Sequence, residues 1–206
     1  MVTILDLIAV AMGLTVLEWI AKPVLAPLLI AFLLRAGVRD LVPVALLFAF
    51  AGDVALLGSG QVMFLIGMLF FFGNQLCLIV AFRRRSRPRW PTILIGGLLW
   101  LAVNALLWGQ LGDLRIPMLV YSLALIAMAC AATGNGYRVA TGGVLFLASD
   151  LLIGFGKAGL RVPAHDILVM ATYAAALAFI AVGWARAVTR RPRGDLHGLP
   201  PGLPAT

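Results

Sequence analysis

The chain has 206 residues, of which 63% are apolar and only 12% are charged. A water-soluble domain is about half apolar and a quarter charged, so this composition excludes one and predicts an integral membrane protein. The formal charge of +8 does not indicate nucleic acid, because five of the sixteen basic residues fall in residues 83–89 and four in residues 186–193. Both stretches lie beside apolar runs, as expected of cytoplasmic loops that contact anionic lipids.

Eight apolar segments follow one another, each near the roughly 20 residues that a membrane-spanning helix needs. No basic stretch precedes the first segment and no small-residue cleavage site follows it, so we expect it to be retained. The second is the weakest, because only twelve residues separate Lys22 from Arg35 and two of them are Pro23 and Pro27. The predicted helices cover residues 3–20, 22–35, 41–57, 61–82, 91–109, 116–133, 138–155 and 165–188.

The sequence therefore predicts an all-α, polytopic integral membrane protein of about eight transmembrane helices. We expect one helical domain in residues 1–189 and a disordered cytoplasmic tail in residues 190–206, which is rich in proline and lacks an apolar period. When Lys and Arg are counted over alternate loops, the loops on one side of the membrane carry twelve and those on the other side carry four. With an even number of spans, this bias predicts an inner or plasma membrane protein with both termini in the cytoplasm.

The third and seventh segments resemble each other. One reads Leu47-Phe48 and then Gly52-Asp53, and the other reads Leu145-Phe146 and then Ser149-Asp150. Four segments separate the copies, so this pattern favours a parallel four-plus-four repeat. Chance similarity between two leucine-rich helices is the alternative.

Asp53 and Asp150 are the only carboxylates well inside apolar runs. A charged group near the bilayer centre costs several kcal/mol, so such residues mark a function or a buried partner. In the predicted orientation both lie roughly 6–8 Å from the outer ends of their helices, at about 1.5 Å per residue. Other polar side chains gather at a similar depth and predict one cavity that opens toward the outer leaflet, although each alone can serve as an interhelical hydrogen bond. These residues are Glu18, Lys22, Asn104, Tyr121, Ser122, Thr172 and Tyr173, with Asn74 and Gln75 nearer the middle.

These positions together resemble the YhhN-type lysoplasmalogenase family. The resemblance rests on Lys22-Pro23, Gly52-Asp53, Tyr121, Phe146 with Ser149-Asp150, and Met170 with Thr172-Tyr173. It implies a membrane enzyme that hydrolyses the vinyl-ether bond of lysoplasmalogens to a fatty aldehyde and a glycerophospho-alcohol, with Asp53 and Asp150 as catalytic residues. Three positions depart from the family pattern: Asn74 stands in place of a His, Cys77 in place of a Tyr, and Leu177 in place of a Gln.

Two carboxyl groups suit this chemistry, because one can protonate the enol carbon while the other stabilises the resulting cation or activates water. The sequence does not say which aspartate is the acid. We predict no cofactor and no metal, since His165 and His197 are the only histidines and they belong to no ligand cluster. The expected partners are membrane lipids and a lysophospholipid or other ether-lipid substrate, without nucleic acid. The predicted substrate-binding residues are Lys22, Asn74, Tyr121, Ser149, Thr172 and Tyr173.

Two other classes stay open. Intramembrane carboxylates in related repeats are also typical of proton-coupled transporters of small molecules or lipids. The departures from the family pattern also fit a catalytically altered lipid-binding membrane protein.

Overall fold

The computed structural model describes residues 15–160 and 163–189, with the backbone alone for residues 15–23. These residues form seven α-helices, two short 3-10 helices and no strand. The 3-10 helices, Gly112–Leu114 and Thr133–Asn135, lie before and after α6. The α-helices are α2 (Thr15–Arg35), α3 (Leu41–Leu56), α4 (Gln61–Arg85), α5 (Trp90–Leu107), α6 (Arg115–Ala132), α7 (Tyr137–Lys157) and α8 (His165–Thr189).

Five helical stretches of the described chain are long and apolar enough to cross a membrane. The prediction of a polytopic helical membrane protein is confirmed, and α3 to α8 begin and end within three residues of their predicted bounds. The apolar part of α2 (Val24–Arg35) and α3 are shorter. The five stretches are Gln61–Arg85, Trp90–Leu107, Gly112–Asn135, Tyr137–Lys157 and His165–Thr189.

The predicted boundary between the first two segments is wrong. Helix α2 continues from Thr15 to Arg35 through Lys22, Pro23 and Pro27. Prolines are tolerated inside membrane helices, because neighbouring groups and local adjustments satisfy the backbone groups that they leave without a partner. Residues 3–14 of the first predicted helix, and the predicted tail 190–206, lie outside the described residues. The count of eight spans and the four-plus-four repeat therefore stay predictions.

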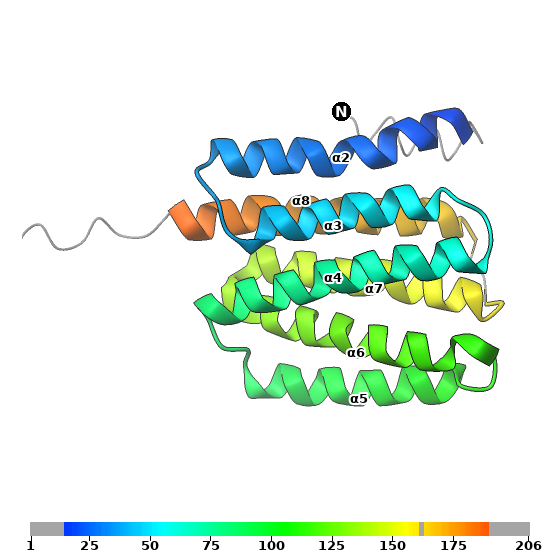
Figure 1. Ribbon diagram of the computed structural model, residues 1–206. Helices are drawn as coiled ribbons and strands as arrows, with labels where there is room; N and C mark the ends of the chain where they lie inside the picture. The colour runs from blue at the N-terminus through cyan, green and yellow to red at the C-terminus, as the bar shows by residue number, and fades with distance from the viewer. Residues whose placement is uncertain (1–14, 161–162, 190–206) are drawn as a thin grey trace, which may run out of the picture.

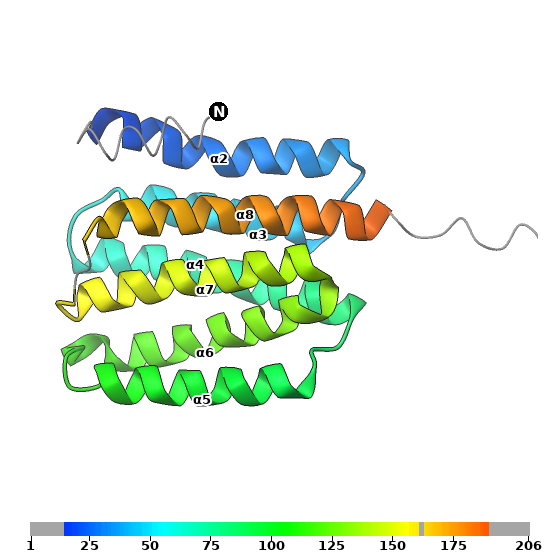
Figure 2. The same ribbon diagram turned by 180° about the vertical axis from the view of Figure 1, so that it is seen from behind.

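Six of the helices form a closed ring, which Figures 1 and 2 show from opposite sides. Going round the ring, α2 packs on α3, α3 on α4, α4 on α6, α6 on α7, α7 on α8 and α8 back on α2. Helix α5 lies outside the ring, at the lower edge in Figure 1, and packs mainly on α6. Much of the α5 surface is therefore left for lipid.

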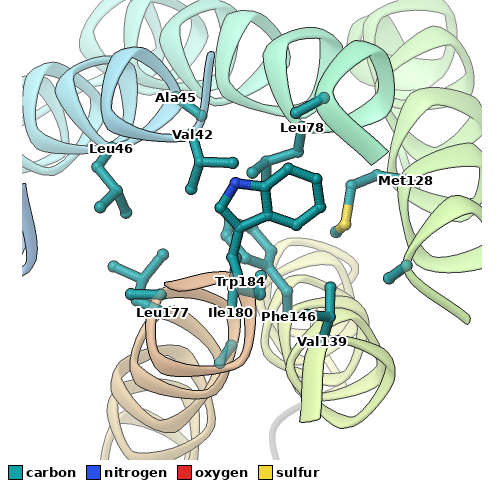
Figure 3. Close-up of a cluster of buried hydrophobic side chains, with 14 of the residues drawn as sticks. Val42, Ala45, Leu46, Leu78, Met128, Val139, Phe146, Leu177, Ile180 and Trp184 are labelled. Carbon is teal, nitrogen blue, oxygen red and sulfur yellow. The ribbon is translucent and has the colours of Figure 1, made fainter. Parts of the chain in front are cut away.

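The centre of the ring is a hydrophobic core to which all six helices contribute. Figure 3 shows part of it, with Trp184 of α8 among side chains of α3, α4, α6 and α7. Trp184 also packs on Phe82 at 5.3 Å between ring centroids and donates to the carboxylate of Asp40 at 2.6 Å. Asp40 caps the start of α3 by accepting a hydrogen bond from the Val42 amide. These contacts fix α8 against the beginning of α3.

The two ends of the bundle differ in charge. Successive helices run in opposite directions, so α3 and α7 run the same way (Figure 1). Residues 35–40, 83–89 and 133–138, with the end of α8, form what we call the arginine end. The loops 57–60, 108–114 and 158–160 lie at the opposite end. The candidate site lies toward this opposite end.

Candidate functional site

Asp150 lies on α7, and its carboxylate accepts a hydrogen bond from the hydroxyl of Tyr121 on α6. Two turns of helix separate Asp150 from Lys157, the last residue of α7. Both Asp150 and Tyr121 are half-buried, and both line a hollow in the protein. This pair presents a carboxyl group to the hollow.

Asp53 lies on α3, four residues before the end cap Leu57, and it is buried. Its carboxylate accepts a hydrogen bond of 2.8 Å from the hydroxyl of Tyr173 on α8. Tyr173 is buried as well. The structure thus contains two carboxylate–tyrosine pairs, each of which joins two different helices.

Aromatic rings connect the two pairs. The Tyr173 ring packs edge-on against Phe71 of α4 and Phe146 of α7, at 5.8 and 5.7 Å between centroids. Phe71 and Phe146 lie 6.2 Å apart, so the three rings form a triangle. Phe71 also lines the hollow beside Asp150, so the triangle lies between the Asp53–Tyr173 pair and that hollow. We therefore treat the two pairs as parts of one candidate site.

Glycines allow α3 and α4 to pack closely beside the Asp53–Tyr173 pair. Gly52 and Gly67 face each other across α3 and α4, and a Cβ on either would lie 3.3 Å from the carbonyl oxygen of the other. A Cβ on Gly52 would also lie 2.8 Å from the Phe71 ring. The small residue before Asp53 thus brings α4 close enough to place Phe71 against Tyr173.

The hollow beside Asp150 has a cavity volume of about 70 Å³. Pockets that hold small molecules usually range from about 300 to 1,000 Å³, so side chains around this hollow must move to admit a lipid head. Its walls are mostly apolar, and Phe71 of the aromatic triangle forms part of them. The residues around it are Leu56, Phe64, Met68, Phe71, Val103, Asn104, Leu107, Leu111, Met118, Tyr121, Ser122, Leu125, Asp150, Leu151, Ile153 and Gly154.

A second, shallower groove runs between α4 and α6 on the outside of the bundle. It is almost wholly apolar and shares two residues, Met68 and Tyr121, with the hollow. These two side chains therefore separate the groove from the space beside Asp150. The groove is lined by Leu65, Met68, Leu69, Phe72, Pro117, Val120 and Tyr121.

The remaining predicted site residues have different surroundings. Ser149 donates to the Val169 carbonyl at 3.1 Å, and Thr172 donates to carbonyls of its own helix. Both hydroxyl groups thus bond to helix backbone, and their predicted contact with substrate stays untested. Asn74 is fully buried, and neither atom of its amide group has a hydrogen-bond partner. Lys22 lies on α2, in the stretch of which only the backbone is described.

The structure adds Phe71, which the sequence did not single out. Phe71 lies in a run of three phenylalanines, and no local signal marks which of them points at the site. Gln75 is fully buried, and its side chain lies near the Tyr121 hydroxyl, although neither amide atom has the geometry of a hydrogen bond. The sequence places Gln75 in the predicted polar cavity but not among the predicted substrate-binding residues. The described residues contain no cluster of three or more His, Cys, Asp or Glu that could hold a metal ion.

A small polar network ties α5 to the wall of the hollow. The Trp100 indole donates to the Ser122 hydroxyl at 3.1 Å, and the Asn104 amide donates to the same oxygen at 3.2 Å. Asn104 also donates to the Trp100 carbonyl at 2.8 Å. Asn104 and Ser122 both line the hollow, so this network holds the outermost helix against the site.

The fold and the site define a class: an α-helical integral membrane protein with two carboxylate–tyrosine pairs beside an apolar hollow. Residues 17–184 match the model of the YhhN family, and the chain therefore belongs to the YhhN family. This confirms the resemblance found in the sequence. No curated protein and no solved structure gives a significant match.

Proposed function

We propose that this protein is a membrane-embedded hydrolase that cleaves the vinyl-ether bond of a lysoplasmalogen-like lipid to a fatty aldehyde and a glycerophospho-alcohol. The observation that carries the proposal is the Tyr121–Asp150 pair on the wall of an apolar hollow, with Asp53 held by Tyr173 in the same site. Membership of the YhhN family supports it. The proposal includes eight spans, related as a parallel repeat, and cytoplasmic termini, so that the hollow faces the outer leaflet.

Because Asp150 lines the hollow, it is the aspartate that contacts the lipid in this proposal. Protonated Asp150 transfers its proton to the enol carbon, which leaves an oxocarbenium ion and an Asp150 carboxylate. The hydrogen bond from Tyr121 stabilises that carboxylate. Water then adds to the carbon that carries the oxygen, and its proton returns to Asp150. The hemiacetal collapses when its hydroxyl proton moves to the departing alcohol oxygen.

Asp53 acts differently, because it does not line the hollow. Its carboxylate, oriented by Tyr173, places negative charge near the cation that forms during the reaction. The aromatic triangle keeps Tyr173 in position and keeps bulk water from the carboxylate. The two aspartates thus divide the work of acid and electrostatic stabiliser, as two carboxyl groups do in glycoside cleavage.

The apolar walls fit a hydrocarbon chain. The groove between α4 and α6 faces the surrounding lipid and leads to Met68 and Tyr121, which also border the hollow. Methionine is flexible and adapts to irregular apolar ligands. A chain can therefore pass from the bilayer toward Asp150 without crossing a polar barrier.

The transporter alternative has less support. A carrier needs a polar path to the other side of the membrane. Between the site and the arginine end, the ring is filled by the apolar core that Figure 3 shows, with Leu78, Met128 and Ile180 fully buried. The described residues thus favour access from one side.

The test is aldehyde release from a lysoplasmalogen by the purified protein in neutral detergent. We expect Asp150→Asn to reduce turnover by about 10²–10⁴-fold, as is typical of losing a general acid or base. Asp166→Asn is the matched control, because Asp166 is exposed in the first turn of α8. Thermal unfolding of each variant separates lost chemistry from lost folding. Full aldehyde release by folded Asp150→Asn would rule out the assignment.

A further inference from the structure

Two cations, Arg115 and Lys157, lie on the helices that wall the hollow, at the end opposite the arginine end. Lys157 is the last residue of α7, and its ammonium lies 4.2 Å from the centroid of the Phe64 ring. Phe64 forms part of the wall of the hollow. The cation–π contact therefore holds the Lys157 charge beside this wall, since a cation is attracted to the face of an aromatic ring.

Arg115 is the first residue of α6. Its guanidinium stacks over Trp108 at 5.8 Å, and its Nε is buried without a hydrogen-bond partner. Met118, one turn further along α6, lines the hollow. The Met118 methyl would lie 3.4 Å from a Cβ on Gly154, so the beginning of α6 packs beside the end of α7 that carries Lys157.

The charge of Arg115 lies at the unfavourable end of its helix. The amino end of a helix carries partial positive charge, which repels a cation. No side chain caps this helix end. Asp113 lies two residues earlier but is exposed, and neither Arg115 nor Lys157 forms an ion pair within the described residues. A buried donor without a partner costs free energy that an anionic ligand would recover.

We propose that Arg115 and Lys157 form a subsite for the phosphate group of a single-chain lipid whose reacting end lies at Asp150. This rests on the proposed function, whose substrate carries a phosphate group, and adds the two residues that bind that group. Lys157 lies two helical turns, roughly 10 Å, beyond Asp150 on the same face of α7. A glycerol spacer and the extended lysine side chain together bridge that separation. Arginine and lysine both bind phosphate through charge-assisted hydrogen bonds.

The experiment measures binding of two lipids that cannot be hydrolysed, a saturated monoalkyl glycerol phosphate and the matching monoalkyl glycerol, to the purified chain in neutral detergent. We expect the wild type to bind the phosphate-bearing lipid more tightly by about tenfold or more. Lys157→Met and Arg115→Met should each remove most of that preference and leave binding of the neutral lipid unchanged. Lys157→Arg should retain it.

Arg138→Met is the matched control, because Arg138 also stacks on an aromatic ring, that of Tyr137 at 5.3 Å, but lies at the arginine end. It should leave both affinities unchanged. Arg115→Met removes a buried donor that has no partner, so its thermal stability should equal or exceed that of the wild type. Lost selectivity in that variant cannot then be attributed to unfolding.

Equal affinity of the wild type for the two lipids would overturn the subsite. It would also be overturned if the Met variants lost affinity for both lipids equally. If inorganic phosphate displaces the bound lipid as effectively as free monoalkyl glycerol phosphate does, the site binds free anions. That result would also overturn the lipid subsite. These readouts need no turnover. If the wild type releases no aldehyde but discriminates between the lipids, the proposed reaction fails and the subsite stands. If turnover is unaffected by the phosphate group, the subsite fails and the reaction stands.

Discussion

Tyr173 donates a hydrogen bond to Asp53 across 120 positions of the sequence, at 2.8 Å, and thereby joins α8 to α3. The same phenol ring packs on Phe71 and Phe146. Tyr173 is thus at once a hydrogen-bond donor to one aspartate and an apolar part of the core. This double role means that its hydroxyl and its ring can be tested separately.

Tyr173→Phe should remove the hydroxyl and keep the ring. Because the buried Asp53 carboxylate then loses a donor, we expect the free energy of unfolding to fall by about 1–3 kcal/mol. Aldehyde release should fall as well, since Asp53 is no longer oriented. Thermal unfolding and turnover in detergent measure the two effects. Tyr137→Phe is the control, because Tyr137 is 72% exposed, and it should change neither quantity.

Much of the fold could be predicted, because apolar length and loop signals determine a membrane helix almost by themselves. Gly60 and Gly136, each with positive φ at the start of a helix, mark two of the correctly predicted boundaries. The wrong prediction was the helix boundary at Pro23, because a proline inside a helix of a soluble protein usually kinks or ends it. In a membrane the helix continues, since no water competes for its backbone groups.

The site was only partly predictable. Intramembrane carboxylates are rare and costly, so Asp53 and Asp150 stand out in the sequence. Their tyrosine partners belong to different helices, and which helices meet depends on packing round the ring. The cations Arg115 and Lys157 looked only like topology signals, because the sequence does not reveal that they pack on the rings of Trp108 and Phe64.

The orientation can be tested with single cysteines. Cys77→Ala and Cys130→Ser provide a background without native thiols, and the serine keeps a donor for the Thr92 carbonyl. We expect Gln110→Cys, in the loop before α6, to react with an impermeant reagent in intact cells. Arg87→Cys, at the arginine end, should react only after permeabilisation. The reverse pattern would place the hollow on the cytoplasmic side.

The contact between α7 and α8 depends on glycine. A Cβ on Gly142 would lie 2.9 Å from both the Ala176 carbonyl oxygen and the Ile180 amide nitrogen, which are backbone atoms that cannot move aside. We therefore expect Gly142→Ala to destabilise the protein by about 1–3 kcal/mol. Gly97→Ala on α5 meets nothing within 4 Å and should be neutral or slightly stabilising. Equal melting temperatures for the two variants would contradict this packing.

Substitutions at Asn74 should change the stability of the fold and the rate of the reaction in different directions. Both atoms of its buried amide lack partners, so Asn74→Leu should raise the free energy of unfolding by about 1–3 kcal/mol. Asn135 is the matched control, since its buried amide donates to the Ala131 and Phe82 carbonyls at 3.0 and 3.4 Å. Asn135→Leu should therefore destabilise.

A side chain that stays polar at a cost to stability is expected where a ligand uses it. If Asn74 contacts the lipid or the attacking water, Asn74→Leu should lower aldehyde release while it raises the melting temperature. Asn74→His restores the imidazole that the family resemblance implies at this position and should increase turnover. Unchanged turnover in both variants, with the Leu variant more stable, would show that Asn74 takes no part in the reaction. Activity gained only in Asn74→His would show that this chain keeps the fold and the aspartates but acts on a different lipid.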